Sequence, residues 1–258
     1  MFKTRLLSGI VLVIILIATV GTGGGLLFGF LALISLIGLS ELYKVVDVQN
    51  KILGLTGYLA AVVYYGILYT GQMQYVTFFT IAFLVVLMAV YVFLFPTFKA
   101  EQVMTVFFGV FYVAVMLSYV YQTRMLADGA VAVWLIFLSS WGCDTCAYCA
   151  GMLLGKHKMA PKLSPKKSVE GGIGGIVGAA LLGAIFAFAA NKITGAGVSA
   201  GQYAIICGVG GMISQIGDLA ASAIKRSHDI KDFGNLIPGH GGILDRFDSI
   251  LFTAPVVY

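Results

Sequence analysis

The sequence of 258 residues is far more apolar than that of a soluble domain. Apolar residues make up 60% of it and charged residues 10%, with a mean hydropathy of +0.98 and a formal charge of +5. Soluble domains carry about 25% charged residues, so the composition excludes an ordinary soluble protein. We expect the lipid bilayer to be its solvent.

Hydrophobic runs recur along the whole chain. A helix that crosses about 30 Å of hydrocarbon needs about 20 mostly apolar residues. Nine candidate runs occur, at 6–20, 26–42, 52–69, 74–95, 103–121, 131–151, 171–190, 202–223 and 243–258. The sequence therefore predicts an all-α, polytopic membrane protein with about nine transmembrane helices. The first run resembles a signal peptide, but no small-x-small cleavage site follows it, so we expect a retained helix.

Basic residues are distributed unevenly between the connections. With nine spans, nearly all of the 16 lysines and arginines fall on the side of the amino terminus. Arg124 and Lys192 fall on the opposite side. The positive-inside rule then predicts a cytoplasmic amino terminus.

The run 131–151 contains a C-x-x-C-x-x-C motif, formed by Cys143, Cys146 and Cys149, with Asp144 inside it. Three thiolates could bind zinc or an iron–sulfur cluster, but the usual sites need a fourth ligand, and Cys207 lies at the far end of another run. Free cysteine otherwise behaves as a small apolar residue. We expect these cysteines to pack, and Asp144 to be the functional residue.

The run 171–190 carries a small residue at every fourth position. The repeat consists of Gly171, Gly175, Ala179, Gly183 and Ala187. Small residues at this spacing let two helix backbones approach closely. We therefore expect this helix to be tightly seated against a neighbour.

Two basic connections, 155–172 and 225–242, lie on the predicted cytoplasmic side. Such loops commonly contact anionic lipid headgroups. Here, however, acidic residues lie near the same ends of the helices, namely Asp144, Asp218, Asp245 and Asp248. Carboxylates within membrane spans are costly and are functional candidates by default. We expect these two loops and the four carboxylates to form one site.

The spacing within the carboxylate regions adds detail. Asp218, Ser222 and Lys225 stand at i, i+4 and i+7, which places them on one helical stripe. Carboxylate oxygens suit Mg²⁺, which binds one or two of them together with substrate phosphates. Lysine side chains and glycine N–H groups suit the phosphates themselves. The pattern indicates phosphoryl or nucleotidyl transfer at the membrane surface.

The segment 222–248, "SAIKRSHDIKDFGNLIPGHGGILDRFD", resembles the signature of the phosphatidate cytidylyltransferases, or CDP-diacylglycerol synthases. The signature is S-x-x-K-R, then K-D, then P-x-H-G-G-x-x-D-R-x-D. The motifs D-T-x-A-Y at 144–148 and S-P-K-K-x-x-E at 164–170 are also similar to the family. Residues 1–125 carry no specific motif, so we expect 126–258 to form the catalytic region.

The resemblance implies a reaction in which CTP and phosphatidic acid give CDP-diacylglycerol and pyrophosphate. It implies Mg²⁺ as cofactor, with a second cation possible, and a homodimer in the bilayer without a nucleic-acid partner. The expected location is the cytoplasmic membrane, or the endoplasmic reticulum in a eukaryote.

The resemblance also implies roles for individual residues. The implied catalytic residues are Asp218, Asp245, Lys225, Arg226 and His240. The implied substrate-binding residues are Ser164, Lys166, Lys167, Glu170, Ser222, Lys231, Asp232, Gly241, Gly242 and Arg246. The implied metal ligands are Asp144, Asp218, Asp245 and Asp248.

A cation-coupled transporter is the alternative, with the intramembrane aspartates carrying protons or ions. Transporters place charges near the midplane and are often built from two symmetric repeats. This sequence has no visible repeat, and it gathers its acidic residues toward one face in its second half. The pattern favours the enzyme.

Overall fold

The computed structural model describes residues 2–195, 197–239 and 241–258. His240 therefore lies outside the described residues. The chain forms two compact units, and each is considered by itself. Unit 1 contains the residues up to Ser118 together with Asp232–Arg246. Unit 2 contains Tyr119–Lys231 and Phe247–Tyr258. The predicted catalytic region, 126–258, was defined by its motifs and stays a prediction.

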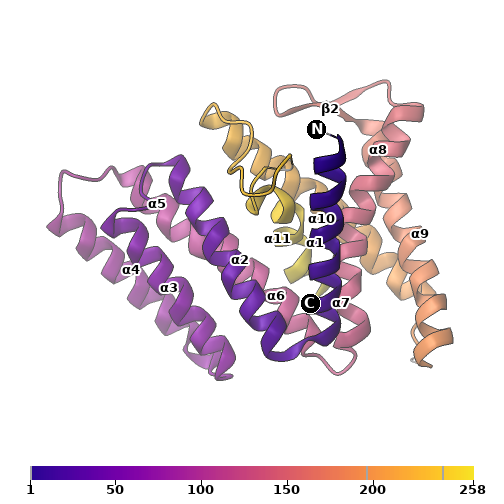
Figure 1. The fold of residues 1–258 in the computed structure, drawn as a ribbon, viewed down its shortest axis with the longest axis horizontal. Helices are drawn as coiled ribbons and strands as arrows, with labels where there is room; N and C mark the ends of the chain where they lie inside the picture. Colours follow the sequence, from indigo (N-terminus) through magenta and orange to yellow (C-terminus); the bar gives the residue numbers. More distant parts are fainter. Residues whose placement is uncertain (1, 196, 240) are drawn as a thin grey trace. The chain divides into compact units, whose positions relative to one another are not determined.

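Helices dominate both units, as the apolar runs predict (Figure 1). Those before residue 125 are α1 (Phe2–Thr22), α2 (Gly24–Val45), α3 (Ile52–Tyr69), the 3₁₀ turn η1 (Met73–Tyr75), α4 (Val76–Phe93), α5 (Ala100–Gly109), the π-helical η2 (Val110–Val115) and α6 (Met116–Arg124). Those after it are α7 (Gly129–Phe137), the π-helical η3 (Leu138–Gly142), α8 (Cys143–Leu154), α9 (Val169–Thr194), α10 (Ala200–Ser227) and α11 (Leu244–Val257).

Seven helical segments among the described residues are long and apolar enough to cross a membrane. Two of these spans are continuous helices that contain a π-helical stretch, at Ala100–Arg124 and Gly129–Leu154. The remaining two predicted runs are also helical but shorter, with an apolar stretch of Leu7–Thr22 in α1 and 14 residues in α11. The all-α, polytopic class is confirmed, while nine complete spans stay a prediction.

The core of unit 1 contains several buried tyrosines, and Tyr43 shows how one of them joins three helices. The buried Tyr43 donates its hydroxyl to the carbonyl of Val106 at 3.0 Å. Its ring passes so close to Gly57 and Gly109 that a Cβ at either position would collide with it. A buried phenol needs a hydrogen-bond partner. Together these contacts fix α2 against α3 and α5.

The core of unit 2 is formed by α8, α9 and α10, with α9 packed along both neighbours (Figure 1). The five small residues predicted to form a ribbon on α9 are all buried. A Cβ at Gly175 would lie 3.0 Å from the Sγ of Cys143, and one at Gly183 would lie 2.8 Å from that of Cys207. The predicted close helix packing is confirmed.

The opposite face of α9 is apolar and open. Ile173, Val177, Leu181, Ile185 and Phe188 recur at helical spacing and are 53% to 68% exposed. Large apolar side chains in this arrangement would be unfavourable in water but are favourable in hydrocarbon. This face is therefore suited to contact lipid.

Among the described residues, the connection between α8 and α9 forms strands rather than a helix. Residues of the lysine-rich connection form an antiparallel hairpin of β1 (Lys158–Ala160) and β2 (Ser164–Ser168). The sequence predicted only a loop here. The hairpin lies at the end of α8, where it leads directly into α9 (Figure 1).

Candidate active site

The hairpin is anchored to the start of α9 by two side chains. The Oγ of Ser168 accepts the N–H of Gly171 at 3.1 Å, which caps the helix. Glu170 accepts the N–H groups of Lys156 at 3.0 Å and His157 at 3.2 Å, and contacts the Nδ1 of His157 at 2.6 Å. Glu170, predicted to bind substrate, therefore holds the base of the hairpin. Its anchoring fixes the direction of the lysines on β2.

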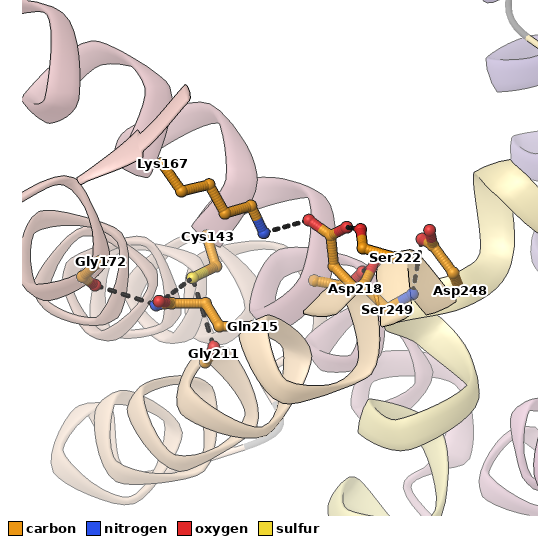
Figure 2. A network of polar contacts seen from close by, with 10 residues as sticks. Cys143, Lys167, Gly172, Gly211, Gln215, Asp218, Ser222, Asp248 and Ser249 are labelled. Carbon is orange, nitrogen blue, oxygen red and sulfur yellow. Dashed lines mark hydrogen bonds and ion pairs between the residues drawn. The ribbon is translucent and has the colours of Figure 1, made fainter. Parts of the chain in front are cut away.

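Lys167, on β2, forms an ion pair with Asp218 of α10 (Figure 2). The Oγ of Ser222 lies one helical turn further on and donates to the Oδ1 of Asp218 at 3.5 Å. The side chains of Lys167 and Asp218 are 27% and 25% exposed. The predicted stripe of Asp218 and Ser222 is thus confirmed. The carboxylate of Asp218 is partly accessible at the protein surface.

Asp248 extends this acidic region on α11. Its side chain is buried and its Oδ1 accepts the N–H of Ser249 at 2.8 Å (Figure 2). It interacts electrostatically with Asp218, Lys225 and Asp144. Lys225 is itself buried, and it completes the predicted stripe of α10. Three carboxylates and two lysines of unit 2 are therefore gathered in one region.

A cavity of about 370 Å³ lies beside this region. Its volume falls in the range of small-molecule sites, which is about 300 to 1,000 Å³. Charged lining comes from Asp144, Asp218, Lys166 and Lys167, and Ser164 adds a hydroxyl. The remaining lining is formed by Ala147, Tyr148, Gly151, Met152, Met159, Ser168, Gly171, Gly172 and Gln215. Lysines from the hairpin and carboxylates from two helices thus line one cavity of ligand size.

Gln215 lines the cavity but was not predicted. Its Nε2 donates to the carbonyl of Gly172 at 2.9 Å and contacts the Sγ of Cys143 at 3.5 Å (Figure 2). These contacts lock α10 to α9 beneath the hairpin. The available sequence signal was a polar, uncharged side chain within an apolar run, one turn before Asp218.

The glycine-rich loop before α11 belongs to unit 1. The Oδ2 of Asp245 accepts the N–H groups of Phe233 at 2.8 Å and Gly242 at 2.9 Å. The N–H of Ile237 donates to the carbonyl of Gly241 at 2.9 Å, and Gly241 has a φ of +85° that favours glycine. Asp245 therefore closes this loop, in addition to its predicted role as a metal ligand.

Glu41 of α2 also holds this loop and was missed by the sequence analysis. Its two oxygens accept the N–H groups of Ile243 at 3.0 Å and Leu244 at 2.8 Å. A carboxylate within an apolar run was the available signal, by the same rule that selected Asp144 and Asp218.

Other predicted site residues lie at the end of α10, in the segment that follows it, or in the first turn of α11. The exposed Arg226 donates from Nη1 to the carbonyl of Ile230 at 2.9 Å, which closes the turn after α10. Lys231 and Asp232 are exposed, and Arg246 lies half-buried in the first turn of α11. The substrate-binding roles predicted for these residues stay predictions.

The cysteines of the C-x-x-C-x-x-C motif lie against small residues. The buried Cys143 contacts the carbonyl of Gly211 from its Sγ at 3.4 Å. Cys146 packs so closely on Gly178 that a Cβ there would collide with its side chain, whereas Cys149 is exposed. All four cysteines are free thiols in the described part of the chain. These contacts agree with the predicted packing role for Cys143 and Cys146, while that of Cys149 stays a prediction.

The donor set of unit 2 also fits Mg²⁺ chemically. Asp144, Asp218 and Asp248 offer hard carboxylate oxygens in one charged region. Within the described residues, no group of three or more acidic, cysteine or histidine side chains forms a ready-made metal cage. Mg²⁺ rarely uses such a cage, because it binds through one or two carboxylates, waters and substrate phosphates.

The spans and the charged cavity define a class, which is a multi-pass membrane protein with a site suited to anionic ligands. The chain belongs to the cytidylyltransferase family, whose sequence profile matches residues 3–258. It is 33% identical to the phosphatidate cytidylyltransferase of Bacillus subtilis, over 99% of this chain and 96% of the relative. The enzymes of the same name from Staphylococcus saprophyticus and Staphylococcus haemolyticus are 31% and 30% identical, over 99% of this chain and 97% of each relative. The family expected from the motifs is confirmed.

Proposed function

We propose that this chain transfers a cytidylyl group from CTP to phosphatidic acid. An oxygen of the lipid phosphate attacks the α-phosphorus of CTP, the bond from that phosphorus to the β-phosphate oxygen breaks, and pyrophosphate leaves. The products are CDP-diacylglycerol and pyrophosphate. The lipid phosphate is already a nucleophile, so no serine or cysteine nucleophile is needed.

The observation that carries this proposal is the cavity between the hairpin and α8 to α10, whose lysines and carboxylates face one another. Lys166 and Lys167 bind the triphosphate and offset its charge. When CTP binds, its phosphates compete with Asp218 for Lys167. Lys225 is buried on α10 beside Asp248, and it adds positive charge as pyrophosphate departs.

The carboxylates supply the second part of the site. Asp144, Asp218 and Asp248 would hold Mg²⁺, and Asp245 stays a predicted ligand. The bound ion would neutralise charge on the phosphates during in-line displacement. A second cation would bind in the same acidic region.

The setting of the reaction is also proposed. The uneven distribution of lysines and arginines supports an amino terminus and hairpin on the cytoplasmic side of a bacterial inner membrane. We propose a homodimer as the functional form, as the family resemblance implies.

The test is turnover by the purified protein. Radiolabelled CTP and phosphatidic acid, supplied in mixed micelles with Mg²⁺, should give lipid-soluble label and pyrophosphate in equal amounts. Diacylglycerol, which lacks the phosphate nucleophile, should give no product. Absence of labelled lipid with phosphatidic acid, from protein that elutes as a folded species, would contradict the proposal.

A further inference from the structure

Glu41 is a buried carboxylate that binds a helix end distant in sequence. It lies on α2 and is 8% exposed. Its oxygens accept the N–H groups of Ile243 and Leu244, at the start of α11. The first N–H groups of a helix have no acceptor within the helix, and the positive end of the helix dipole favours an anion there. Glu41 thus supplies a helix cap from about 200 residues away.

The space around Glu41 is created by two glycines. A Cβ at Gly234 would collide with its Oε1, and a Cβ at Gly242 would collide with both oxygens. These glycines lie on either side of the loop that precedes α11. The absence of side chains at both positions therefore allows the carboxylate to reach the backbone.

Glu41 and Asp245 together hold the loop. Asp245 accepts the N–H groups of Phe233 and Gly242, while Glu41 accepts those of the next two residues, Ile243 and Leu244. Three consecutive N–H groups are thus bound by two carboxylates. The loop conformation and the start of α11 depend on both side chains.

We propose that Glu41 is a positioning residue for the reaction. It fixes the first turn of α11, and thereby the direction of Asp245 and Arg246, without contacting substrate itself. This inference rests on the proposed function. Because the hairpin lysines bind CTP, loss of Glu41 should slow turnover while leaving CTP binding nearly unchanged. Misplacing a reacting group by about 1 Å can cost about a hundredfold in rate.

The test compares Glu41→Gln with Glu101→Gln. Glutamine keeps one oxygen that can accept a backbone N–H. Its amide NH₂ group lies against the other backbone N–H and cannot accept it, so one hydrogen bond is lost. Glu101 is an exposed residue of α5, so its variant makes the same charge change away from the loop. We expect Glu41→Gln to lower kcat about tenfold to a hundredfold and to leave the KM for CTP within about twofold. Glu101→Gln should behave like the parent.

Amide hydrogen exchange supplies a readout independent of activity. Exchange in 232–244 should become faster in Glu41→Gln, with 169–227 unchanged. If the parent forms no CDP-diacylglycerol, the proposed function fails. The exchange rates still test whether the hydrogen bonds from Glu41 stabilise the start of α11. An unchanged kcat, a change confined to the KM for CTP, or unchanged exchange would overturn the proposal.

A second variant covers the case in which Glu41→Gln does not fold. Gly234→Ala pushes the carboxylate aside rather than removing it, and it should reproduce the loss of kcat. Where both single variants fold, the double variant should be no slower than the slower single one, since both act through one contact. A multiplicative loss in the double variant would contradict a shared mechanism.

Discussion

Replacing Asp218 with asparagine removes the central charge of the polar network while keeping the shape of the side chain. Asp218 pairs with Lys167 and accepts from Ser222, and it lines the cavity. Asparagine retains an oxygen that Ser222 can reach, but it offers neither a counter-ion to Lys167 nor a good ligand for a hard cation.

The expected free-energy changes distinguish an effect of Asp218→Asn on stability from an effect on catalysis. Exposed ion pairs are worth about 0 to 1 kcal/mol, and breaking a buried pair costs about 3 to 5 kcal/mol. With side chains about a quarter exposed, the Lys167–Asp218 pair falls between these limits, at about 1 to 2 kcal/mol. Loss of metal-borne stabilisation of the transition state is worth about 4 kcal/mol, or a thousandfold in rate. Asp218→Asn should therefore fold but turn over about a thousandfold more slowly.

A double-mutant cycle with Lys167→Met tests whether Asp218 takes part in the reaction or only forms the ion pair with Lys167. The assay is CDP-diacylglycerol formation against Mg²⁺ concentration, with membrane insertion and elution as controls. If Asp218 acts on the reaction, the double variant should be at least as slow as Asp218→Asn. A near-parental rate for Asp218→Asn, or recovery of activity in the double variant, would refute this reasoning.

Four further outcomes are expected. Replacing the three motif cysteines together with alanine should leave most activity and the metal content unchanged, and a zinc or iron signal lost on replacement would contradict the packing role. Single cysteines placed at Lys166 and Lys192 in a cysteine-free chain should react with an impermeant reagent in intact cells only at 192, whereas labelling at 166 would reverse the topology. Lys166→Met and Lys167→Met should each raise the KM for CTP about tenfold and that for phosphatidic acid less, since a charge-assisted hydrogen bond contributes about 1.5 to 3 kcal/mol; equal effects on both substrates would indicate a general surface role. Gly183→Leu should drive α9 from α10 and lower the unfolding temperature in detergent, whereas an unchanged temperature would contradict close packing there.

The helices were predictable because a bilayer allows few alternatives for backbone that crosses it. Apolar length alone therefore located the helices. The π-helical turns were not predictable, because the extra residue in η3 depends on packing rather than on composition. The β1–β2 hairpin was missed for a similar reason. It is held by the anchors Ser168 and Glu170, not by an alternating apolar pattern.

The site was predictable where charge stood out against an apolar run. This rule found Asp144, Asp218 and Asp248, and the helical period correctly placed Ser222 beside Asp218. The partnership of Lys167 with Asp218 spans 51 residues, so no local pattern could reveal it. Glu41 follows the same rule, but its partners could not be identified from the sequence, because they are backbone N–H groups about 200 residues away.

The length of α10 has a consequence for where the chemistry takes place. Its 28 residues extend about 42 Å, about 12 Å more than the hydrocarbon core. Such a helix must tilt or project into the headgroup layer, and its last third carries Asp218, Ser222 and Lys225. Under the proposed function, bilayer thickness would therefore set the depth at which these side chains meet the phosphate of a lipid. Thicker bilayers would draw more of the helix end into hydrocarbon, so we expect turnover to depend on the acyl-chain length of the host membrane.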